Sequence, residues 1–289
     1  MRTHIVTPTW RAPSSESMPG APRDRSVHLE IAGLVFQVVG ASGLSLAWIK
    51  ERYRPFVSRK PSQIRLHMEI QHAWPGGRPP QPRVDWQNGN FEIKMPACRA
   101  QGSIAGKCIR VSVPPVTTAL SPSLLRFLCS LLLLRQGGFM LHASGVIQNR
   151  SAWVFCGPSE AGKTTIARLA GARRVLNDET VAILKRGRGY VAYSTPFFGE
   201  GGPVMGEVQA RAALKGMCFL HKAKQFAHRQ LTASQAVGRA FSQVFLPKRD
   251  HTVVASILET LADFAGRVPC YDLFFRAHPD LWEYLDGIA

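Results

Sequence analysis

Alternating apolar and polar residues predict a β-rich first part of the chain. QIRLHMEI over 63–70 alternates with a period of two, which is typical of a strand with one buried face. VDWQNGNFEIKM over 84–95 predicts a hairpin, because Asn88-Gly89 suits a type I′ turn, whose two central residues need positive φ. Three further elements are predicted: strands with a turn over 28–40, a short helix over 41–56 that ends near Pro55, and a strand over 106–113.

The second part of the chain mixes apolar strand patterns with helical ones. The apolar run over 124–134 predicts a buried helix that is too short to cross a bilayer, and Thr232 and Gln235 have the spacing of a capping box. The elements predicted here are strands over 138–147, 151–156, 173–178, 217–220 and 269–275, a hairpin over 181–193, and helices over 164–171, 232–245 and 251–266.

These elements predict an α/β protein with three parts. Residues 1–27 are rich in Pro, Ser, Arg and Gly without an apolar period, so we expect a disordered tail. Residues 28–118 are expected to form a small β-rich domain, and Pro114-Pro115 marks its end. Residues 119–289 are expected to form a larger domain with a mixed sheet.

Composition sets limits on compartment and partners. The chain has a formal net charge of +17, which attracts anions, but its basic residues are scattered, so nucleic acid is not favoured as a partner. Six cysteines form no CxxC pair and lie mostly in apolar runs, which favours reduced, buried thiols in a cytoplasmic protein. No apolar signal segment opens the sequence, and a membrane partner is not expected.

The strongest chemical signal is GPSEAGKTT, which has the G-x-x-x-x-G-K-[ST] spacing of a phosphate-binding loop. A predicted strand precedes it and a predicted helix follows it. Glycines let backbone amides converge on phosphate oxygens, the lysine supplies a cation, and the first threonine supplies a Mg²⁺ ligand. The predicted nucleotide-binding residues are Gly157, Pro158, Ser159, Glu160, Ala161, Gly162, Lys163, Thr164 and Thr165.

The connection before this loop excludes the usual motor and GTPase architecture. Three polar residues, 148–150, separate the strand containing His142 from the strand that enters the loop. A parallel pair needs a long crossover, so these two strands are expected to be antiparallel. His142 is then expected beside the loop.

Five segments in this order resemble the HPr kinase/phosphatase family. They are LHAS, GPSEAGKTT, VLNDETVAI, STPFFGE and VPCYDLFF, and the resemblance covers about 120–289. It is more specific to bacterial HPr-kinase-like proteins, whose P-loop fold is shared with ATP-dependent phosphoenolpyruvate carboxykinase. The YRPF segment resembles the small domain that precedes the kinase domain in those relatives. Some act in clusters for ribosomally made peptides, where they phosphorylate a serine of the precursor, as in lasso-peptide tailoring.

The resemblance also implies site residues. It implies Asp178 as the group that takes the acceptor hydroxyl proton or lies beside Mg²⁺, and His142 as a contact of the γ-phosphate or of the acceptor. The phosphate-loop motif itself places Lys163 at the β- and γ-phosphates. For Mg²⁺ the resemblance implies Thr164, Asp178 and Glu179, with Glu200 in the loop 194–203 that closes over the site. Each also has a purely structural interpretation: 177–179 as a capping turn, His142 as a structural residue, and 194–203 as a surface turn.

Two departures from the family pattern matter. Glu179 stands where relatives often have a second Asp, and Glu160 stands inside the phosphate loop where relatives usually have Gly. A carboxylate there is unfavourable for a bound triphosphate, and positive φ is strained for Glu.

Two hypotheses follow from the sequence. The first is a Mg-ATP-dependent kinase for a serine of a small protein or peptide. The second is a non-catalytic nucleotide-binding module that holds an acidic peptide or partner protein. A carboxykinase of small metabolites is disfavoured by the chain length. The sequence leaves ATP against GTP, phosphatase activity and assembly into a homo-oligomer open.

Overall fold

The structure is a computed structural model, and it describes most of the chain from residue 26 onward. The described residues are 26–40, 42–70, 83–87, 89–96, 98–103, 105–113, 120–198, 209–246 and 251–288. The tail expected over 1–27 lies outside them except for its last two residues, because strand β1 already begins at Val27. Residues 199–203 of the expected closing loop, with Glu200, and the domain boundary at 114–119 also lie outside them.

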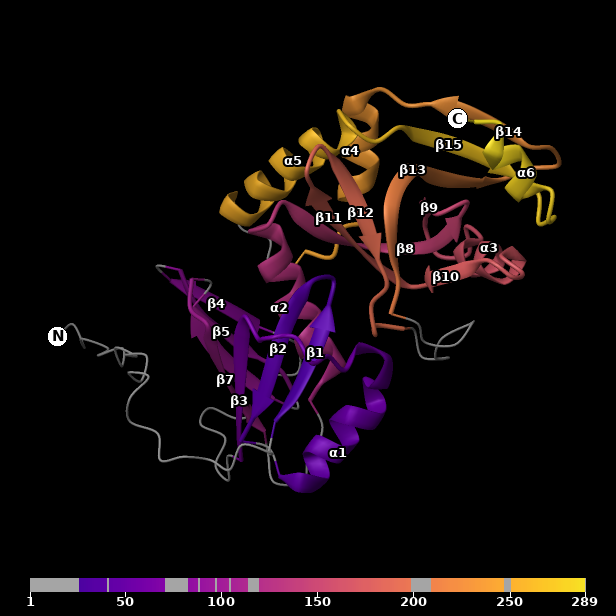
Figure 1. Ribbon diagram of the computed structural model, residues 1–289. Helices are drawn as coiled ribbons and strands as arrows, with labels where there is room; N and C mark the ends of the chain where they lie inside the picture. Colours follow the sequence, from indigo (N-terminus) through magenta and orange to yellow (C-terminus); the bar gives the residue numbers. More distant parts are fainter. Residues whose placement is uncertain are drawn as a thin grey trace.

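The first sheet has seven strands in the order β1-β2-β3-β7-β6-β5-β4 (Figure 1). β3 is parallel to both β2 and β7, and every other pair is antiparallel. The strands are β1 (Val27–Ile31), β2 (Leu34–Val39), β3 (Ile64–Ile70), β4 (Arg83–Gln87), β5 (Asn90–Lys94), β6 (Arg99–Ser103) and β7 (Cys108–Val113). Helix α1 (Gly43–Arg52) joins β2 to β3 and is capped by the Ser42 side chain, and the short 3₁₀ helix η1 (Arg54–Phe56) follows it.

The predicted hairpin is confirmed, since β4 and β5 pair in antiparallel register with Gln87 opposite Asn90. Gly89 has a φ of 78°, a conformation that favours glycine. β6 was not predicted, because RAQGS has few of the apolar side chains that mark a strand. Its place between β5 and β7 comes from backbone pairing on both sides.

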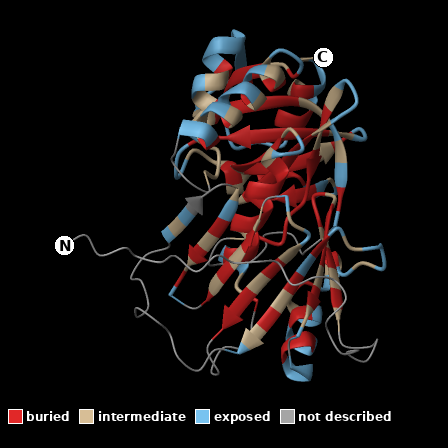
Figure 2. Ribbon diagram, turned by 90° about the vertical axis from the view of Figure 1, so that its left-hand side faces the viewer, coloured by how far each residue is buried: buried red, intermediate tan, exposed pale blue. Residues whose placement is uncertain are grey.

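Helix α2 (Pro122–Leu134) lies between the two sheets (Figure 1). The Ser121 side chain caps its first turn by accepting a hydrogen bond from the Leu124 amide. As predicted it is buried, and it packs against the first sheet and against Met140, Ala182 and Leu184 of the second. One apolar core therefore runs from the first sheet into the second (Figure 2). The division into two domains stays a prediction.

The second sheet contains eight strands, and five of them close a ring. Successive pairings join β8 to β9, β9 to β13, β13 to β12, β12 to β11, and β11 back to β8. Strands β10, β14 and β15 complete the sheet, so the protein is α/β with two mixed sheets. The strands are β8 (Gly138–Gln148), β9 (Ser151–Cys156), β10 (Arg174–Asn177), β11 (Thr180–Arg186), β12 (Gly189–Tyr193), β13 (Arg211–Lys222), β14 (Ala227–Gln230) and β15 (Cys270–Phe275).

β8 and β9 are antiparallel, as the short connection predicted. β13 is parallel to both β9 and β15, so the carboxyl ends of these three strands meet at one edge. β13 is much longer than the strand predicted over 217–220. Its first half is less apolar, so the sequence pattern did not mark it, and pairing with β12 and β9 makes it a strand. In open α/β sheets this edge is the usual place for a ligand.

Helices cover both faces of this sheet. α3 (Lys163–Leu169) and α6 (Leu281–Asp286) pack on Trp153, Phe155 and Leu220. α4 (Ala233–Phe241) and α5 (His251–Ala265) pack on the opposite face, which carries Val154, Cys156 and Phe219. The faces differ because successive side chains of a strand point to opposite sides. The predicted capping box of α4 is confirmed.

All six cysteines are free thiols, and Cys108 alone among them is not fully buried. Within the described part of the chain, no helix is long and apolar enough to span a bilayer.

Gly216 on β13 offers a test of this packing. A Cβ at Gly216 would lie 2.5 Å from Cζ3 of Trp153, which is 1% exposed and has no room to move. Gly216→Ala is therefore expected to lower the free energy of unfolding by about 1–3 kcal/mol, measured by chemical denaturation. Gly189→Ala is the matched control, because a Cβ there meets nothing within 4 Å. Equal stability of the two variants would contradict this account of the β9–β13 contact.

Candidate functional site

The segment 157–162 connects β9 to α3 and bends sharply. Glu160 and Gly162 have φ values of 64° and 110°. A Cβ on Gly157 would lie 2.6 Å from Cβ of Ala161, and a Cβ on Gly162 would lie 2.6 Å from Cζ of Phe275. Both glycines are therefore required by close approach. Glu160 has a positive φ, the backbone conformation that is strained for a glutamate.

The Lys163 side chain lies beneath this loop. Its Nζ donates hydrogen bonds to the carbonyl oxygens of Gly157, at 2.8 Å, and Pro158, at 3.0 Å. Lys163 is buried, and burial lowers the pKa of its ammonium, while nearby Glu179 acts in the opposite direction. An ammonium has three donors, so one remains for a ligand. No side chain caps the start of α3, where the first backbone amides lack helical acceptors.

A cavity of about 540 Å³ opens beside the loop. Its lining joins the loop to the middle of β8, to the β10–β11 turn and to the end of β13. The lining residues are His142, Ser159, Glu160, Gly162, Lys163, Thr164, Thr165, Glu179 and Lys222.

His142 and Glu179 face each other across two paired strands. Nδ1 of His142 lies 3.1 Å from Oε1 of Glu179, and the two side chains are 44% and 33% exposed. Backbone pairing sets this contact, because Thr180 is opposite His142 and the Ala143 amide donates to the Glu179 carbonyl. The imidazole is thus oriented by a carboxylate and still reaches the cavity.

Asn177 holds the turn that presents Glu179. Its buried Oδ1 accepts hydrogen bonds from the amides of Glu179 and Thr180, both at 2.7 Å. Its Nδ2 donates to the Thr195 carbonyl at 2.9 Å, and the Thr195 hydroxyl donates to the Thr180 carbonyl at 2.6 Å. The capping turn considered for 177–179 is therefore present, and it positions an acidic residue at the cavity.

Asp178 lies differently from its neighbour. It is half-buried and is not among the residues that line the cavity. Burial raises the pKa of its carboxyl, with a smaller opposing effect from Arg168. The carboxylate whose charge acts on Lys163 is that of Glu179. Asp178 and Glu179, although adjacent in the turn, therefore face different surroundings. The catalytic role expected for Asp178 stays a prediction.

The remaining predicted residues fall into three groups. Ser159, Thr164 and Thr165 line the cavity, as expected, whereas Pro158 and Ala161 shape the loop through the 3.2 Å bond from the Ala161 amide to the Pro158 carbonyl. Glu200 lies outside the described residues.

Two cations near the site were not predicted. Lys222 lines the cavity because the parallel register pairs Phe219 with Cys156, which carries the end of β13 past the loop. The Arg126 guanidinium of α2 lies 4.8 Å from the ring of Phe245; burial lowers its pKa, and the charge of Glu179 opposes that shift. The sequence holds a partial signal for Lys222 alone, as the first charged residue after the apolar core of its strand.

Comparison with known proteins identifies the family. The model of the family described as SynChlorMet cassette protein ScmC matches residues 125–289, which is more than half of the chain. The chain belongs to the ScmC family. The match includes most of α2, the loop 157–162 and the whole second sheet, so every residue that lines the cavity falls within the ScmC region.

The ScmC chain also has a remote structural similarity. The structure of the Hpr(Ser) kinase/phosphatase from Coxiella burnetii matches it with a TM-score of 0.31 and 10% sequence identity, over 52% of this chain and 94% of that chain. Among curated proteins, no sequence matches the chain.

The raised pKa of Asp178 predicts a pH-dependent stability. The folded state holds this proton more tightly than the unfolded state, whose ordinary pKa is 3.8. Wild type therefore loses stability as the pH rises through the folded-state pKa. Asp178→Asn is expected to have a higher Tm than wild type at neutral pH, and the difference is expected to shrink as the pH falls toward 3.8. A variant that is less stable than wild type at neutral pH would show that Asp178 forms stabilising contacts in its ionised state.

The backbone at Glu160 predicts a second effect on stability. Glu160 has a φ of 64°, which glycine adopts without steric cost. Glu160→Gly is therefore expected to raise the free energy of unfolding by up to about 1 kcal/mol. Glu160→Gln keeps the strain and removes only the charge, and it is expected to leave the free energy of unfolding close to the wild-type value. Chemical denaturation of both variants measures the difference; a stabilising Gln variant would place the cost in the charge instead.

Proposed function

We propose that this ScmC-family protein is a Mg-ATP-dependent kinase that transfers the γ-phosphate to a serine hydroxyl of a small protein or ribosomally made peptide. The observation that carries the proposal is the single cavity in which the loop and Lys163 meet the His142–Glu179 pair. One side of the cavity suits a phosphate chain and the other suits a hydroxyl that must lose its proton.

The residues present fit a nucleotide and its metal. The cavity volume of about 540 Å³ is in the range of small-ligand sites, and the first backbone amides of α3 have no side-chain cap. Lys163 and Lys222 would hold the phosphates. Among the described residues no three His, Cys, Asp or Glu side chains form a metal cluster. Mg²⁺ commonly binds through one or two carboxylates together with substrate phosphates, and Thr164 and Glu179 supply the oxygens for this.

The chemistry divides between ligand and protein. Bound Mg-ATP supplies the phosphoryl group together with neutralisation of its charge. The chain orients the acceptor and takes its proton. Because Nδ1 of His142 faces Glu179, the other ring nitrogen, Nε2, accepts the serine proton, and the Glu179 carboxylate stabilises the resulting imidazolium. Asp178 is the second candidate for the base, as the family resemblance implies.

A second function has its own supporting observation. Glu160 is exposed and lines the cavity, where its negative charge opposes a bound triphosphate. A protein that only holds nucleotide and binds an acidic peptide tolerates this better than a kinase does. The word cassette in the family description suggests neighbouring genes that act together, and their products are the first acceptors to test.

Nucleotide binding comes first among the tests. Lys163→Ala is expected to weaken ATP binding at least about tenfold, because a charge-assisted contact is lost, and Lys222→Ala to weaken it less. Isothermal titration measures both, and Lys224→Ala is the matched control, since this exposed lysine does not line the cavity. Glu160→Gln is expected to bind ATP more tightly than wild type. Equal ATP affinity in all four variants and wild type would reject this site.

Phosphate transfer separates the two functions. Wild type with labelled ATP and Mg²⁺ is expected to label a serine of a peptide encoded beside its gene. His142→Ala is expected to lower the rate by roughly 10²–10³-fold with ATP binding retained. Glu179→Gln is expected to lower it by a similar factor and also to weaken Mg²⁺ binding, and Asp178→Asn to lower it by less. A larger loss with Asp178→Asn than with Glu179→Gln would assign the base to Asp178. Wild type that binds ATP but labels no peptide would leave only the nucleotide-binding module.

A further inference from the structure

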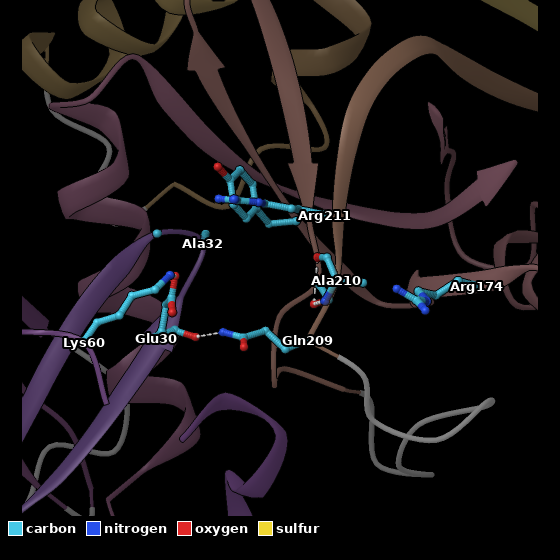
Figure 3. A pocket seen from close by; sticks show the side chains of 10 residues that line it. Glu30, Ala32, Lys60, Arg174, Gln209, Ala210 and Arg211 are labelled. Atoms are coloured by element: carbon cyan, nitrogen blue, oxygen red, sulfur yellow. Dashed lines mark hydrogen bonds and ion pairs between the residues drawn. The ribbon is translucent and has the colours of Figure 1, made fainter. Parts of the chain in front are cut away.

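A second cavity lies between the two sheets, away from the loop (Figure 3). It has a volume of about 340 Å³ and lies between the β1–β2 turn and the start of β13. None of the residues that line it belongs to the phosphate-binding motif or to the cavity beside the loop. The charged groups of its lining are Glu30, Lys60, Arg174 and Arg211.

The charges of this cavity do not balance. Lys60 is paired with Glu30 at 2.6 Å, so these two neutralise each other. Arg174 and Arg211 form no ion pair with any residue that the structure describes, and both are exposed. A third guanidinium, that of Arg186, approaches the rim, because its Nη2 would lie 2.9 Å from a Cβ on Gly33. An excess of positive charge thus faces the cavity.

The walls of the cavity are fixed by hydrogen bonds. The Ser194 hydroxyl accepts from the Ala210 amide at 2.7 Å and donates to the Ala210 carbonyl at 3.1 Å. The Gln209 side chain donates to the Glu30 carbonyl at 3.0 Å and so joins the second sheet to the first. Arg186 donates to the Tyr193 hydroxyl at 3.3 Å, and Arg211 lies 6.0 Å from the Tyr193 ring. Tyr193 therefore contacts the guanidinium groups of Arg186 and Arg211, and hydrogen bonds fix the backbone around them.

We propose that this cavity binds two or more carboxylates of an acidic segment of the peptide substrate. Arg174 and Arg211 come from different strands and lie on opposite sides of Ala210 (Figure 3). Guanidinium groups spread in this way match successive acidic side chains of an extended peptide better than one phosphate, which needs donors that converge on one point.

The position of this cavity suits a substrate-docking role. Ser194 lines it, and the next residue, Thr195, holds the Asn177 side chain that fixes the Glu179 turn. Arg174 begins the four-residue strand β10, whose other end leads into that turn. Arg174 and Asn177, the two ends of β10, are three residues apart, which is roughly 10 Å at 3.3 Å per residue. An extended peptide spans this with about four residues. The assignment of the occupant as the acceptor peptide rests on the proposed function.

Fluorescence anisotropy with a fluorescein-labelled peptide of alternating Glu and Gly tests the proposal. Wild type is expected to bind it in low salt, and to bind the matching Gln-and-Gly peptide much more weakly. Arg174→Gln with Arg211→Gln is expected to weaken binding of the Glu peptide at least about tenfold, since two ion pairs are lost. The charge-matched control is Arg135→Gln with Arg188→Gln, two exposed arginines outside the cavity, which is expected to bind like wild type.

Competition and nucleotide binding complete the test. Inorganic phosphate and free glutamate, each at the same concentration as the other, are expected to displace the peptide poorly. If phosphate displaced the peptide with an affinity equal to that of the peptide, the cavity would be a small-anion site and the proposal would be overturned. Equal loss of binding in the control variant, or no loss in the cavity variant, would also overturn it. Lys163→Ala is expected to keep the peptide, and the cavity variant to keep ATP. A wild type that binds the peptide through Arg174 and Arg211 but never transfers phosphate would reject the kinase while leaving this site in place.

Discussion

The two-residue turn between β8 and β9 constrains the rest of the second sheet. Asn149 and Arg150 have φ values of 48° and 66°, the pair of positive values that a type I′ turn requires. Such a turn leaves no room for a crossover, so β9 returns beside β8 in antiparallel register. β9 also pairs with β13, and the remaining pairings close the ring through β12 and β11. The turn therefore sets where the loop after β9 emerges relative to His142.

The candidate site combines groups that are unfavourable in isolation. Lys163 is a buried cation that donates hydrogen bonds to two loop carbonyls, and Glu160 is a non-glycine residue in the left-handed region. Burial also disfavours the ionised form of Asp178. Strain and desolvation of this kind concentrate at functional sites, where the surrounding fold compensates for them. Here the compensation comes from the core of the ring and from the hydrogen bonds of Asn177 and Thr195.

The two cavities are connected by short segments of backbone. β10 runs from Arg174 at one cavity to Asn177 beside the other, and Ser194 and Thr195 make the same connection on the neighbouring segment. Neither segment contains a glycine. A ligand in the cavity between the sheets and a ligand at the loop would thus be held at a nearly constant separation, which is what a docking site for an extended substrate requires.

Local patterns determined much of this protein from the sequence. Strand alternation, the Asn88-Gly89 hairpin and the capping box of α4 depend on neighbouring residues, and the glycine spacing of the loop reports close backbone approach within a few residues. Contacts between distant segments were decided by the tertiary structure. The parallel register of β9 and β13 brings Lys222 to the loop, and the Asn177 turn presents Glu179, not Asp178, to the cavity. Strand β6, with its weakly apolar sequence, exists because both neighbours supply hydrogen bonds. The cavity between the sheets joins side chains from five separate segments, and no local pattern encodes a meeting of that kind, because it depends on how whole sheets pack.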